Sequence, residues 1–134
     1  MGATVDAIEI HPDRAAALRG MAHPALKVHC ANFLKVTPAP VYDLILMNPP
    51  FSGTHFMDHV KHAWDFLAPG GELRAILPAS AEVGSTAKHE RFRAWAAQHS
   101  PRGYRCHQWR DLPPESFASV GVRINTVVVT LRKL

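Results

Sequence analysis

The sequence predicts a single α/β domain with a mostly parallel sheet, and two patterns carry this prediction. Short apolar runs alternate with amphipathic stretches for most of the 134 residues, and two β-prone segments close the chain. Alternating strands and helices are typical of parallel sheets covered by helices, whereas two final strands in succession predict an antiparallel pair at the C-terminal edge. The length falls within the range of one domain, so we expect residues 1–134 to share one core.

The first half of the chain contains three predicted strands and a short helix. The strands are expected at residues 4–10, 26–31 and 42–47. Pro12 and Asp13 suit the first turn of a helix that ends at Gly20. The third strand is almost entirely apolar, as expected of a strand buried on both faces. It ends at Asn48 because the two prolines that follow cannot donate hydrogen bonds to a neighbouring strand.

The second half continues the alternation. Apolar residues recur at helical spacing over residues 55–67, and Pro69-Gly70-Gly71 predicts a turn that ends this helix. The remaining elements are expected as a strand at 73–77, a helix at 88–98 with Phe92, Trp95 and Ala96 facing inward, and strands at 104–109 and 124–131. Residues 126–130, Thr-Val-Val-Val-Thr, are the most β-prone segment of the chain.

Composition narrows the classes of protein. Hydrophobic residues make up 47% of the chain, which argues against disorder. The sequence contains no run of 18 apolar residues and no basic N-terminal flank, so we expect neither a membrane span nor a signal peptide. Cys30 and Cys106 match no metal or redox spacing, so we expect reduced, buried thiols in a cytoplasmic protein. The net charge of +4 permits an anionic partner such as nucleic acid without requiring one.

In parallel sheets, ligands bind beyond the carboxyl ends of the strands, so the residues that follow each strand are the first candidates for a site. They are Glu9 and Ile10 after the first strand, Asn32 and Phe33 after the second, and Asn48-Pro49-Pro50-Phe51 after the third. This set resembles the class I methyltransferases that use S-adenosylmethionine, in the amino-methylating branch marked by an Asn-Pro-Pro-aromatic motif. Residues 42–47 before the motif and 67–73 after it extend the resemblance.

The end of the chain is similar to small phage- or plasmid-type DNA adenine methyltransferases. The matching segments are residues 109–113, continuing to Phe117, and the strand that begins at Ile124. The resemblance as a whole implies a Rossmann-like sheet. It also implies an enzyme that transfers a methyl group to an exocyclic amine, with adenine N6 in DNA as the expected acceptor.

The chemistry of the motif can also be argued from its residue types. The side-chain carbonyl of Asn48 and the backbone carbonyl of Pro49 can each accept one hydrogen of an amine, which fixes its nitrogen for attack. Pro50 removes a competing donor and stiffens the turn, and Phe51 offers a face on which a flipped base can stack. The alternative is a simple turn with Phe51 in the core.

By the same resemblance, S-adenosylmethionine is the cofactor. Glu9 would hold its ribose hydroxyls with Ile10 beside it, and Asn32 stands where the family commonly has an aspartate that accepts from the adenine amine. Phe33 would pack against the adenine or, alternatively, lie in the core, and Asn48 would also border the cofactor. A separate feature is a histidine face at residues 55, 59 and 62, but nothing in the sequence completes a metal site there, so we expect no metal.

The family's first motif, a strand followed by a glycine-rich turn, is absent because no two glycines are spaced Gly-x-Gly. The chain instead begins with residues that resemble the approach to the family's second strand, so we expect an N-terminally truncated domain that lacks the first βα unit. In the family's sheet that strand lies in the middle. The flanking strands would pair directly, or a second copy or a complementing chain would supply a strand. Without the motif, the alternatives are an inactive remnant that binds nucleic acid or a partner protein, or an enzyme acting on RNA or on protein glutamine.

Overall fold

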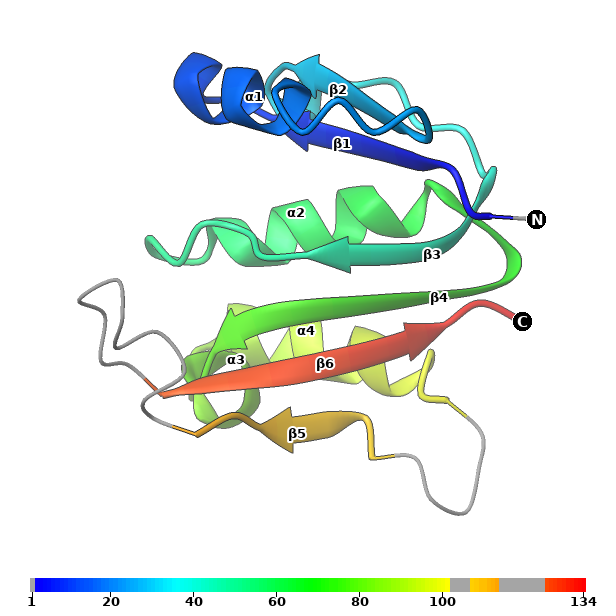
Figure 1. Ribbon diagram of the computed structural model, residues 1–134. Helices are drawn as coiled ribbons and strands as arrows, with labels where there is room; N and C mark the ends of the chain where they lie inside the picture. Colours follow the sequence, from blue (N-terminus) through cyan, green and yellow to red (C-terminus); the bar gives the residue numbers. More distant parts are fainter. Residues whose placement is uncertain (1, 102–106, 114–124) are drawn as a thin grey trace. The chain divides into compact units, whose positions relative to one another are not determined.

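The computed structural model describes residues 2–101, 107–113 and 125–134, and the chain forms two compact units, residues 1–37 and 38–134. Each unit is described by itself. Unit 1 contains β1 (Val5–Glu9), α1 (Pro12–Arg19), β2 (Leu26–Cys30) and a short 3-10 turn, Phe33–Lys35 (Figure 1). These elements confirm the predicted strands and the predicted helix of the first 31 residues to within two residues at each end.

Local signals fix the geometry of unit 1. The His11 side chain accepts a hydrogen bond from the Asp13 backbone N–H and caps α1, whose first residue is Pro12. Strands β1 and β2 pair in parallel from Val5 opposite Leu26 to Glu9 opposite Cys30. Because the strands are parallel, their carboxyl ends lie at the same edge of this two-stranded sheet.

Unit 2 holds the larger sheet and its covering helices. Its elements are β3 (Tyr42–Met47), α2 (His55–Trp64), β4 (Leu67–Pro78), α3 (Ser80–Val83), α4 (Ala87–Ala97), β5 (Trp109–Asp111) and β6 (Thr126–Arg132). The strand order is β3-β4-β6-β5, in which β3 and β4 are parallel and β6 is antiparallel to both of its neighbours. The predicted α/β class, with parallel strands first and an antiparallel pair at the C-terminal end, is confirmed.

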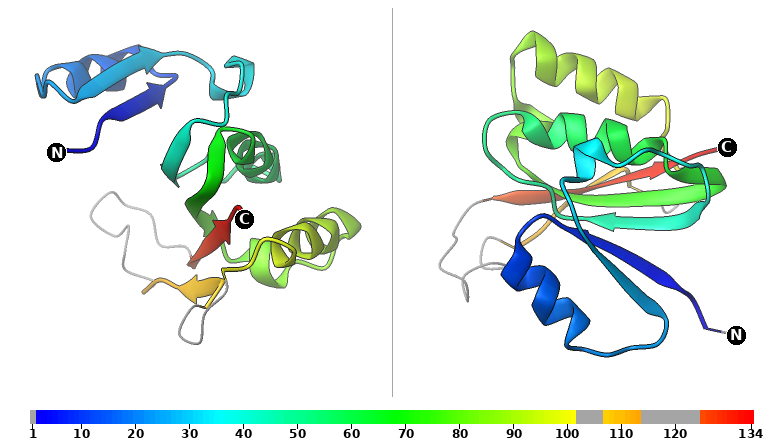
Figure 2. Two further views of the ribbon diagram at one scale, coloured as in Figure 1. Left: turned by 90° about the vertical axis from the view of Figure 1, so that its right-hand side faces the viewer. Right: turned by 90° about the horizontal axis from the view of Figure 1, so that it is seen from above.

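The core of unit 2 lies between one face of this sheet and the helices α2 and α4, which cover the same face (Figure 2). Phe56 of α2 and Phe92 of α4 meet edge to face with ring centroids 5.9 Å apart, and Leu73 and Val129 from the sheet are completely buried. The predicted inward face of the second long helix is confirmed for Phe92 and Ala96, while Trp95 is half-buried. It packs against Trp64, with ring centroids 5.8 Å apart.

The expectation that β3 is buried on both faces is wrong. Leu44 is 53% exposed and Leu46 is 69% exposed. Their register partners on β4 alternate with the buried Leu73 and Ala75, so both leucines lie on the face of the sheet opposite α2 and α4. No described helix of unit 2 covers this face of its sheet, and β3 pairs only with β4 in that sheet. The apolar composition of β3 therefore does not mean that both of its faces are buried. Within the sheet of unit 2, β3 is an edge strand with one exposed apolar face.

The turn predicted at residues 69–71 is part of a strand instead, because β4 begins at Leu67. Between the pairs Tyr42–Leu67 and Leu44–Glu72, β4 carries three more residues than β3, which form an irregular bulge. Gly70 has φ of +84°, a conformation that favours glycine. A side chain at Gly71 would come within 2.9 Å of the Leu67 side chain. The turn-forming residues thus shape a bulge within a continuous strand.

Two further expectations concern the cysteines and the chain's last third. Cys30 is exposed rather than buried, because it ends a strand of the small two-stranded sheet. Cys106, most of the strand predicted at 104–109, Phe117 and Ile124 lie outside the described residues. Among the described helices, none combines the length and apolar character needed to cross a lipid bilayer.

Candidate active site

The Asn-Pro-Pro-Phe motif directly follows β3, which is held to β4 by parallel pairing up to Met47 opposite Ala75. Asn48 is exposed, Pro49 is buried and Phe51 is half-buried. No hydrogen bond from any described residue engages the Asn48 side chain. A buried proline on a strand end therefore anchors an asparagine whose carbonyl and amide are both available to a ligand.

The loop after the motif is tied to the second long helix. Gly53 adopts φ of +58°, and Thr54 precedes α2. Lys88, near the start of α4, donates a hydrogen bond from Nζ to Thr54 Oγ1 at 2.8 Å and lies 3.9 Å from the Asp58 carboxylate. Sequence reasoning missed this role of Lys88, because no local pattern links residues 34 positions apart.

Unit 1 brings the two predicted polar cofactor residues to one edge of its sheet. Glu9 ends β1, and the Ala31 backbone N–H donates to its carbonyl at 3.0 Å, which places Asn32 at the same strand ends. Asn32 Oδ1 accepts a hydrogen bond from the Leu34 backbone N–H at 3.1 Å and caps the short 3-10 turn. Capping fixes this side chain and leaves one lone pair of Oδ1 and the whole amide group for other partners.

Arg14, in the first half of α1, forms an ion pair with the Glu9 side chain. Its hydrogen bond is the main reason that the pKa of Glu9 lies below its usual value, with further lowering from the charge of Arg14 and from a backbone hydrogen bond at His11. Glu9 is therefore ionised at neutral pH and can accept hydrogen bonds with charge assistance. Sequence reasoning missed Arg14, although a basic residue in the turn after a strand-end carboxylate is a detectable signal.

The residues of unit 1 fit the nucleoside portion of S-adenosylmethionine. The Glu9 carboxylate can accept hydrogens from two ribose hydroxyls, and the Asn32 amide can serve the polar edge of an adenine. Ile10 is 61% exposed and Phe33 is half-buried, so both offer apolar surface beside these groups. For the methionine portion, the described residues contain no glycine-rich turn that opens a helix.

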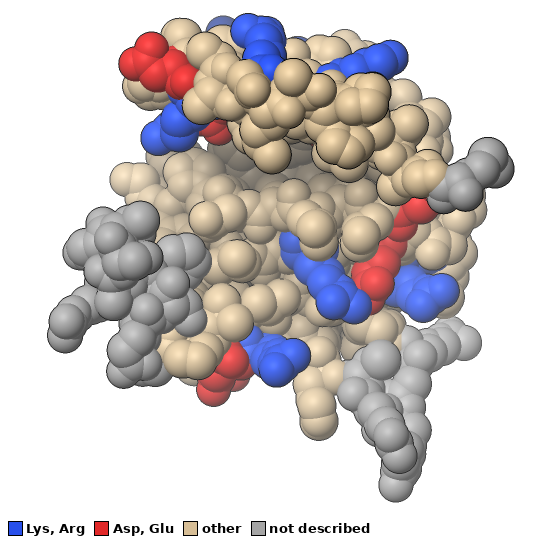
Figure 3. Space-filling model, in the orientation of Figure 1, with Lys and Arg blue, Asp and Glu red and all other residues tan. Residues whose placement is uncertain are grey.

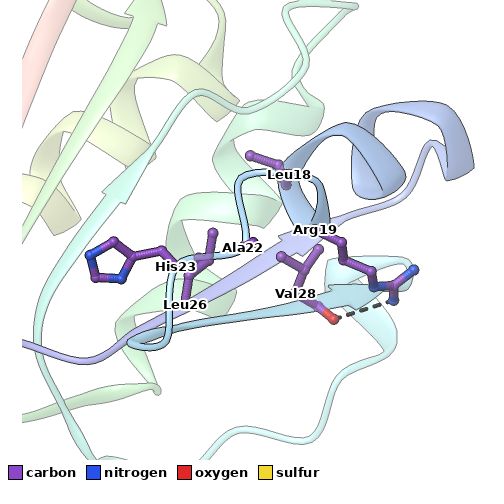
Figure 4. Close-up of a pocket in the computed structure, with 6 residues that line it drawn as sticks. All are labelled: Leu18, Arg19, Ala22, His23, Leu26 and Val28. Carbon is purple, nitrogen blue, oxygen red and sulfur yellow. Dashed lines mark hydrogen bonds between the residues drawn. The ribbon is translucent and has the colours of Figure 1, made fainter.

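A hollow of about 110 Å³ in unit 1 lies away from these residues. It is lined by Leu18, Arg19, Ala22, His23, Leu26 and Val28 (Figure 4). These residues come from the C-terminal end of α1, the turn after it and the first half of β2, and Arg19 donates a hydrogen bond to the Val28 carbonyl at 3.3 Å. The hollow is smaller than the roughly 300–1,000 Å³ typical of small-molecule sites, and it lies opposite the strand ends that carry Glu9 and Asn32.

The histidine face of α2 shows no sign of a metal centre. His55 is exposed, and His59 and His62 are half-buried. Burial lowers the pKa of His59, with smaller lowering from His55 and His62 and an opposing effect of the Asp58 charge. Within residues 2–101, 107–113 and 125–134, no group of three or more His, Cys, Asp or Glu side chains is arranged to hold a metal ion.

Charge is dispersed on the face of the molecule seen in Figure 3, where lysine and arginine side chains alternate with acidic ones and no broad basic surface forms among the coloured residues. On β4, Arg74 and Glu72 form such a mixed pair at 3.4 Å. A nucleic-acid interface on this face would therefore depend on a few separate cations.

Several solved structures have a similar fold. The chain is similar to the N-methyltransferase NodS from Bradyrhizobium japonicum WM9, with a TM-score of 0.63 and 14% identity over 97% of this chain and 73% of NodS. It is similar to the 23S rRNA methyltransferase ErmE, with a TM-score of 0.69 and 17% identity over 98% of this chain and 52% of ErmE. For Atu636 from Agrobacterium tumefaciens, a predicted O-methyltransferase, the TM-score is 0.60 and identity is 18% over 96% of this chain and 62% of that protein.

The chain thus has the Rossmann-like methyltransferase fold, as the sequence predicts. It spans 52% to 73% of the length of these three proteins. No protein-family model and no curated protein matches it. The [4+2]-cyclase SpnF also has a similar fold, with a TM-score of 0.60 and 14% identity over 98% of this chain and 66% of SpnF, so the reaction must be argued from the site residues rather than from the fold.

Proposed function

We propose that the chain transfers a methyl group from S-adenosylmethionine to an exocyclic amine, with adenine N6 in DNA as the acceptor. The observation that carries the proposal is the Asn48 side chain, which lies directly after β3, beside a buried proline, and forms no hydrogen bond with any described residue. A polar group held rigidly at a strand end without a structural partner is available for a ligand. The NodS structure solved in complex with S-adenosyl-L-homocysteine shows that a protein of similar fold binds the product form of this cofactor.

The motif residues have distinct roles in this reaction. Asn48 Oδ1 and the Pro49 carbonyl accept the two amine hydrogens and turn the nitrogen lone pair toward the methyl donor. Pro50 holds the turn, and Phe51 stacks on the purine ring. S-adenosylmethionine supplies the electrophilic methyl group when it is bound. No metal is required, because positioning the amine is the main contribution of the protein.

In the proposed cofactor site, Glu9 binds the ribose hydroxyls, with Ile10 beside it. Asn32 binds the adenine, and Phe33 packs against the adenine face. The family resemblance also assigns Asn48 to the cofactor, because a residue that binds the amine must hold it next to the methyl group. Arg14 keeps Glu9 ionised. Lys88 orders the loop that follows the motif through Thr54.

DNA is proposed as the substrate because the Asn-Pro-Pro-Phe motif and the closing segment resemble phage- and plasmid-type DNA adenine methyltransferases, and the net charge of +4 suits a polyanion. RNA is the second candidate, since ErmE, which is named as a 23S rRNA methyltransferase, has a similar fold with a TM-score of 0.69. We propose that the reaction takes place in the cytoplasm, where both nucleic acids and the cofactor occur.

Transfer of labelled methyl groups from S-adenosylmethionine to adenine-containing duplex DNA, single-stranded DNA and RNA tests the proposal. Incorporation at adenine N6 in DNA that is lost in Asn48→Ala and retained in Ser52→Ala is the expected result. Ser52 is the matched control because it is exposed and follows the motif directly. Incorporation into RNA alone would mean that RNA, and not DNA, is the methyl acceptor.

The opposing hypothesis is an inactive remnant that binds nucleic acid or a partner protein. The absence of a glycine-rich turn from the sequence favours it. Product on none of the acceptors, from a chain that is folded and binds DNA, would support this hypothesis and contradict the proposed enzyme. The control for folding is the circular dichroism spectrum of the same preparation.

A further inference from the structure

Lys88 brings a positive charge to the loop that follows the Asn-Pro-Pro-Phe motif. It lies in the first turn of α4, and its Nζ donates a hydrogen bond to Thr54 Oγ1 at 2.8 Å. Thr54 follows Phe51 by three residues and directly precedes α2. Three residues span at most about 11 Å between Cα atoms, so the ammonium is held close to the motif.

The charge of Lys88 lies where it does not favour the fold. The N-terminal end of an α-helix carries a partial positive charge, so a cation is favourable in the last turn and unfavourable in the first. Lys88 belongs to the first turn of α4, and its ammonium contacts the residue before α2, whose side chain does not cap that helix. The lysine therefore lies near two positive helix ends, and helix stability does not account for its charge.

Asp58 offsets this charge only in part. Its carboxylate is 3.9 Å from Nζ, beyond hydrogen-bonding distance, and the side chains of Lys88 and Asp58 are 44% and 56% exposed. Ion pairs with such exposure contribute little to stability. An ammonium has three N–H donors, and within the part of the chain that the structure describes only Thr54 accepts one from Lys88. Two donors of a solvent-accessible cation thus remain for a ligand.

We infer that Lys88 binds a backbone phosphate of the nucleic-acid substrate, beside the nucleotide whose base is methylated. This inference rests on the proposed function and adds a substrate-binding residue to it. A phosphate oxygen accepts a charge-assisted hydrogen bond from Nζ, on the side of the ammonium that Thr54 leaves open. Thr54 already holds the lysine in place, which reduces the conformational entropy lost when the phosphate binds.

The competing role is a purely structural one, in which Lys88 ties the loop through Thr54 and contacts no substrate. The two roles differ in their dependence on charge. A phosphate contact releases counterions from the nucleic acid, so it adds about one to the slope of log affinity against log salt concentration. A structural tie depends on the hydroxyl of Thr54 as much as on the lysine, and it leaves this slope unchanged.

Fluorescence anisotropy of a labelled, adenine-containing duplex DNA over a series of salt concentrations tests the inference. Lys88→Gln should weaken binding several-fold and reduce the salt slope by about one. Lys88→Arg and Thr54→Val keep the charge and should keep the wild-type slope. Lys61→Gln is the matched control, because Lys61 is exposed, lies in the last turn of α2 and undergoes the same change of charge.

An unchanged slope in Lys88→Gln would overturn the inference. An equal loss of slope in Lys61→Gln would also overturn it, because it would indicate a general effect of net charge. The same loss in Thr54→Val would assign the effect to the loop and have the same consequence. A folded wild-type chain that binds no duplex would contradict the proposed DNA substrate itself, and with it this contact.

Thermal unfolding followed by circular dichroism separates the two roles further. Lys88→Gln should melt no lower than the wild-type chain, because it removes a cation from two positive helix ends. A lower melting temperature together with an unchanged salt slope would establish the structural tie instead of the phosphate contact.

The kinetics of methyl transfer provide an independent readout. Lys88→Gln should raise the KM for duplex DNA and leave kcat unchanged, because the contact is made equally in the bound state and in the transition state. A lower kcat at an unchanged KM would mean that Lys88 supports the motif rather than the substrate, and would overturn the inference.

Discussion

The two units carry their candidate functional residues on scaffolds of very different strength. Of the sixteen buried apolar residues described, fifteen belong to unit 2 and only Ala15 belongs to unit 1. Asn48 therefore stands on a close-packed core, whereas Glu9 and Asn32 stand on a two-stranded sheet with one short helix. Since packed cores resist displacement and small sheets open readily, the proposed amine-binding motif has the more rigid support, and the residues proposed to bind the nucleoside should gain most from a bound ligand.

The largest effect is expected in the core of unit 2. Phe56→Ala should lower the free energy of unfolding by about 3–5 kcal/mol, because it empties a fully buried position against Phe92. Val5→Ala in unit 1 should change it by less than about 0.5 kcal/mol, since Val5 is 51% exposed. Urea unfolding followed by circular dichroism measures both. Equal effects of the two substitutions would contradict the difference in packing between the two units.

Asn48→Ala should reduce methyl transfer by about 10²–10³-fold, the range found when one positioned hydrogen-bonding group is removed from an active site. Its free energy of unfolding should change by less than about 0.5 kcal/mol, because the side chain is exposed and bonded to no described residue. Initial rates and urea unfolding of the same preparations provide the test. A large loss of stability would mean that Asn48 serves the turn rather than a substrate.

Gly71→Ala should destabilise the bulge of β4 by about 1–3 kcal/mol, because the added Cβ would lie 2.9 Å from both the Ala68 carbonyl oxygen and the Leu67 side chain. Gly2→Ala is the control, since no atom lies within 4 Å of the added methyl group. Thermal unfolding of both variants measures the difference. An unchanged Gly71→Ala variant would contradict the close approach at the bulge.

His99 makes the stability of unit 2 dependent on pH. It stacks on Trp64 with ring centroids 4.0 Å apart, and burial, helped by the charge of Lys133, lowers its pKa. On acidification the unfolded chain takes up the proton first, near pH 6.5, so the free energy of unfolding should fall as the pH drops below this value. His99→Gln should flatten this part of the profile. A wild-type profile with no fall below pH 6.5 would contradict the burial of this ring.

The smallest effect is expected at the ion pair of unit 1. Arg14→Ala should reduce stability by no more than about 1 kcal/mol, because the Arg14 side chain is 68% exposed. It should also raise the pKa of Glu9 toward its usual value. Because the pKa of Glu9 is lowered in the folded chain, the contribution of the pair is present above the unfolded pKa and is lost as the pH falls through the folded one. Titration by NMR checks both statements, and an unshifted Glu9 would exclude the pair.

Local signals explain which parts of this fold the sequence could predict. Pro12 and Gly20 mark the ends of α1, and the two prolines after Asn48 mark the end of β3, so these boundaries follow from neighbouring residues. The bulge of β4 was not predicted, because the same Pro-Gly-Gly residues serve a turn or a bulge according to the strand beside them. The exposure of Leu44 was not predicted either, since an apolar run does not show whether a partner covers it.

The candidate site also combines features that follow from neighbouring residues with features that depend on the folded chain. The motif at Asn48 and the strand-end residues Glu9 and Asn32 follow from where polar groups stand relative to apolar runs. The partners Arg14 and Lys88 depend on folded geometry, in one case across 34 residues. Sequence therefore predicts which groups do chemistry more readily than which groups hold them in place.

Calorimetric titration of S-adenosyl-L-homocysteine into the purified chain tests the central claim most directly. The account predicts saturable binding that is lost in Glu9→Gln and kept in Asp13→Asn, a control that removes a charge from the adjacent first turn of α1. An absence of binding to the folded wild-type chain would contradict the claim that this chain is a methyltransferase. Binding that is indifferent to Glu9→Gln would contradict the assignment of the nucleoside site to unit 1.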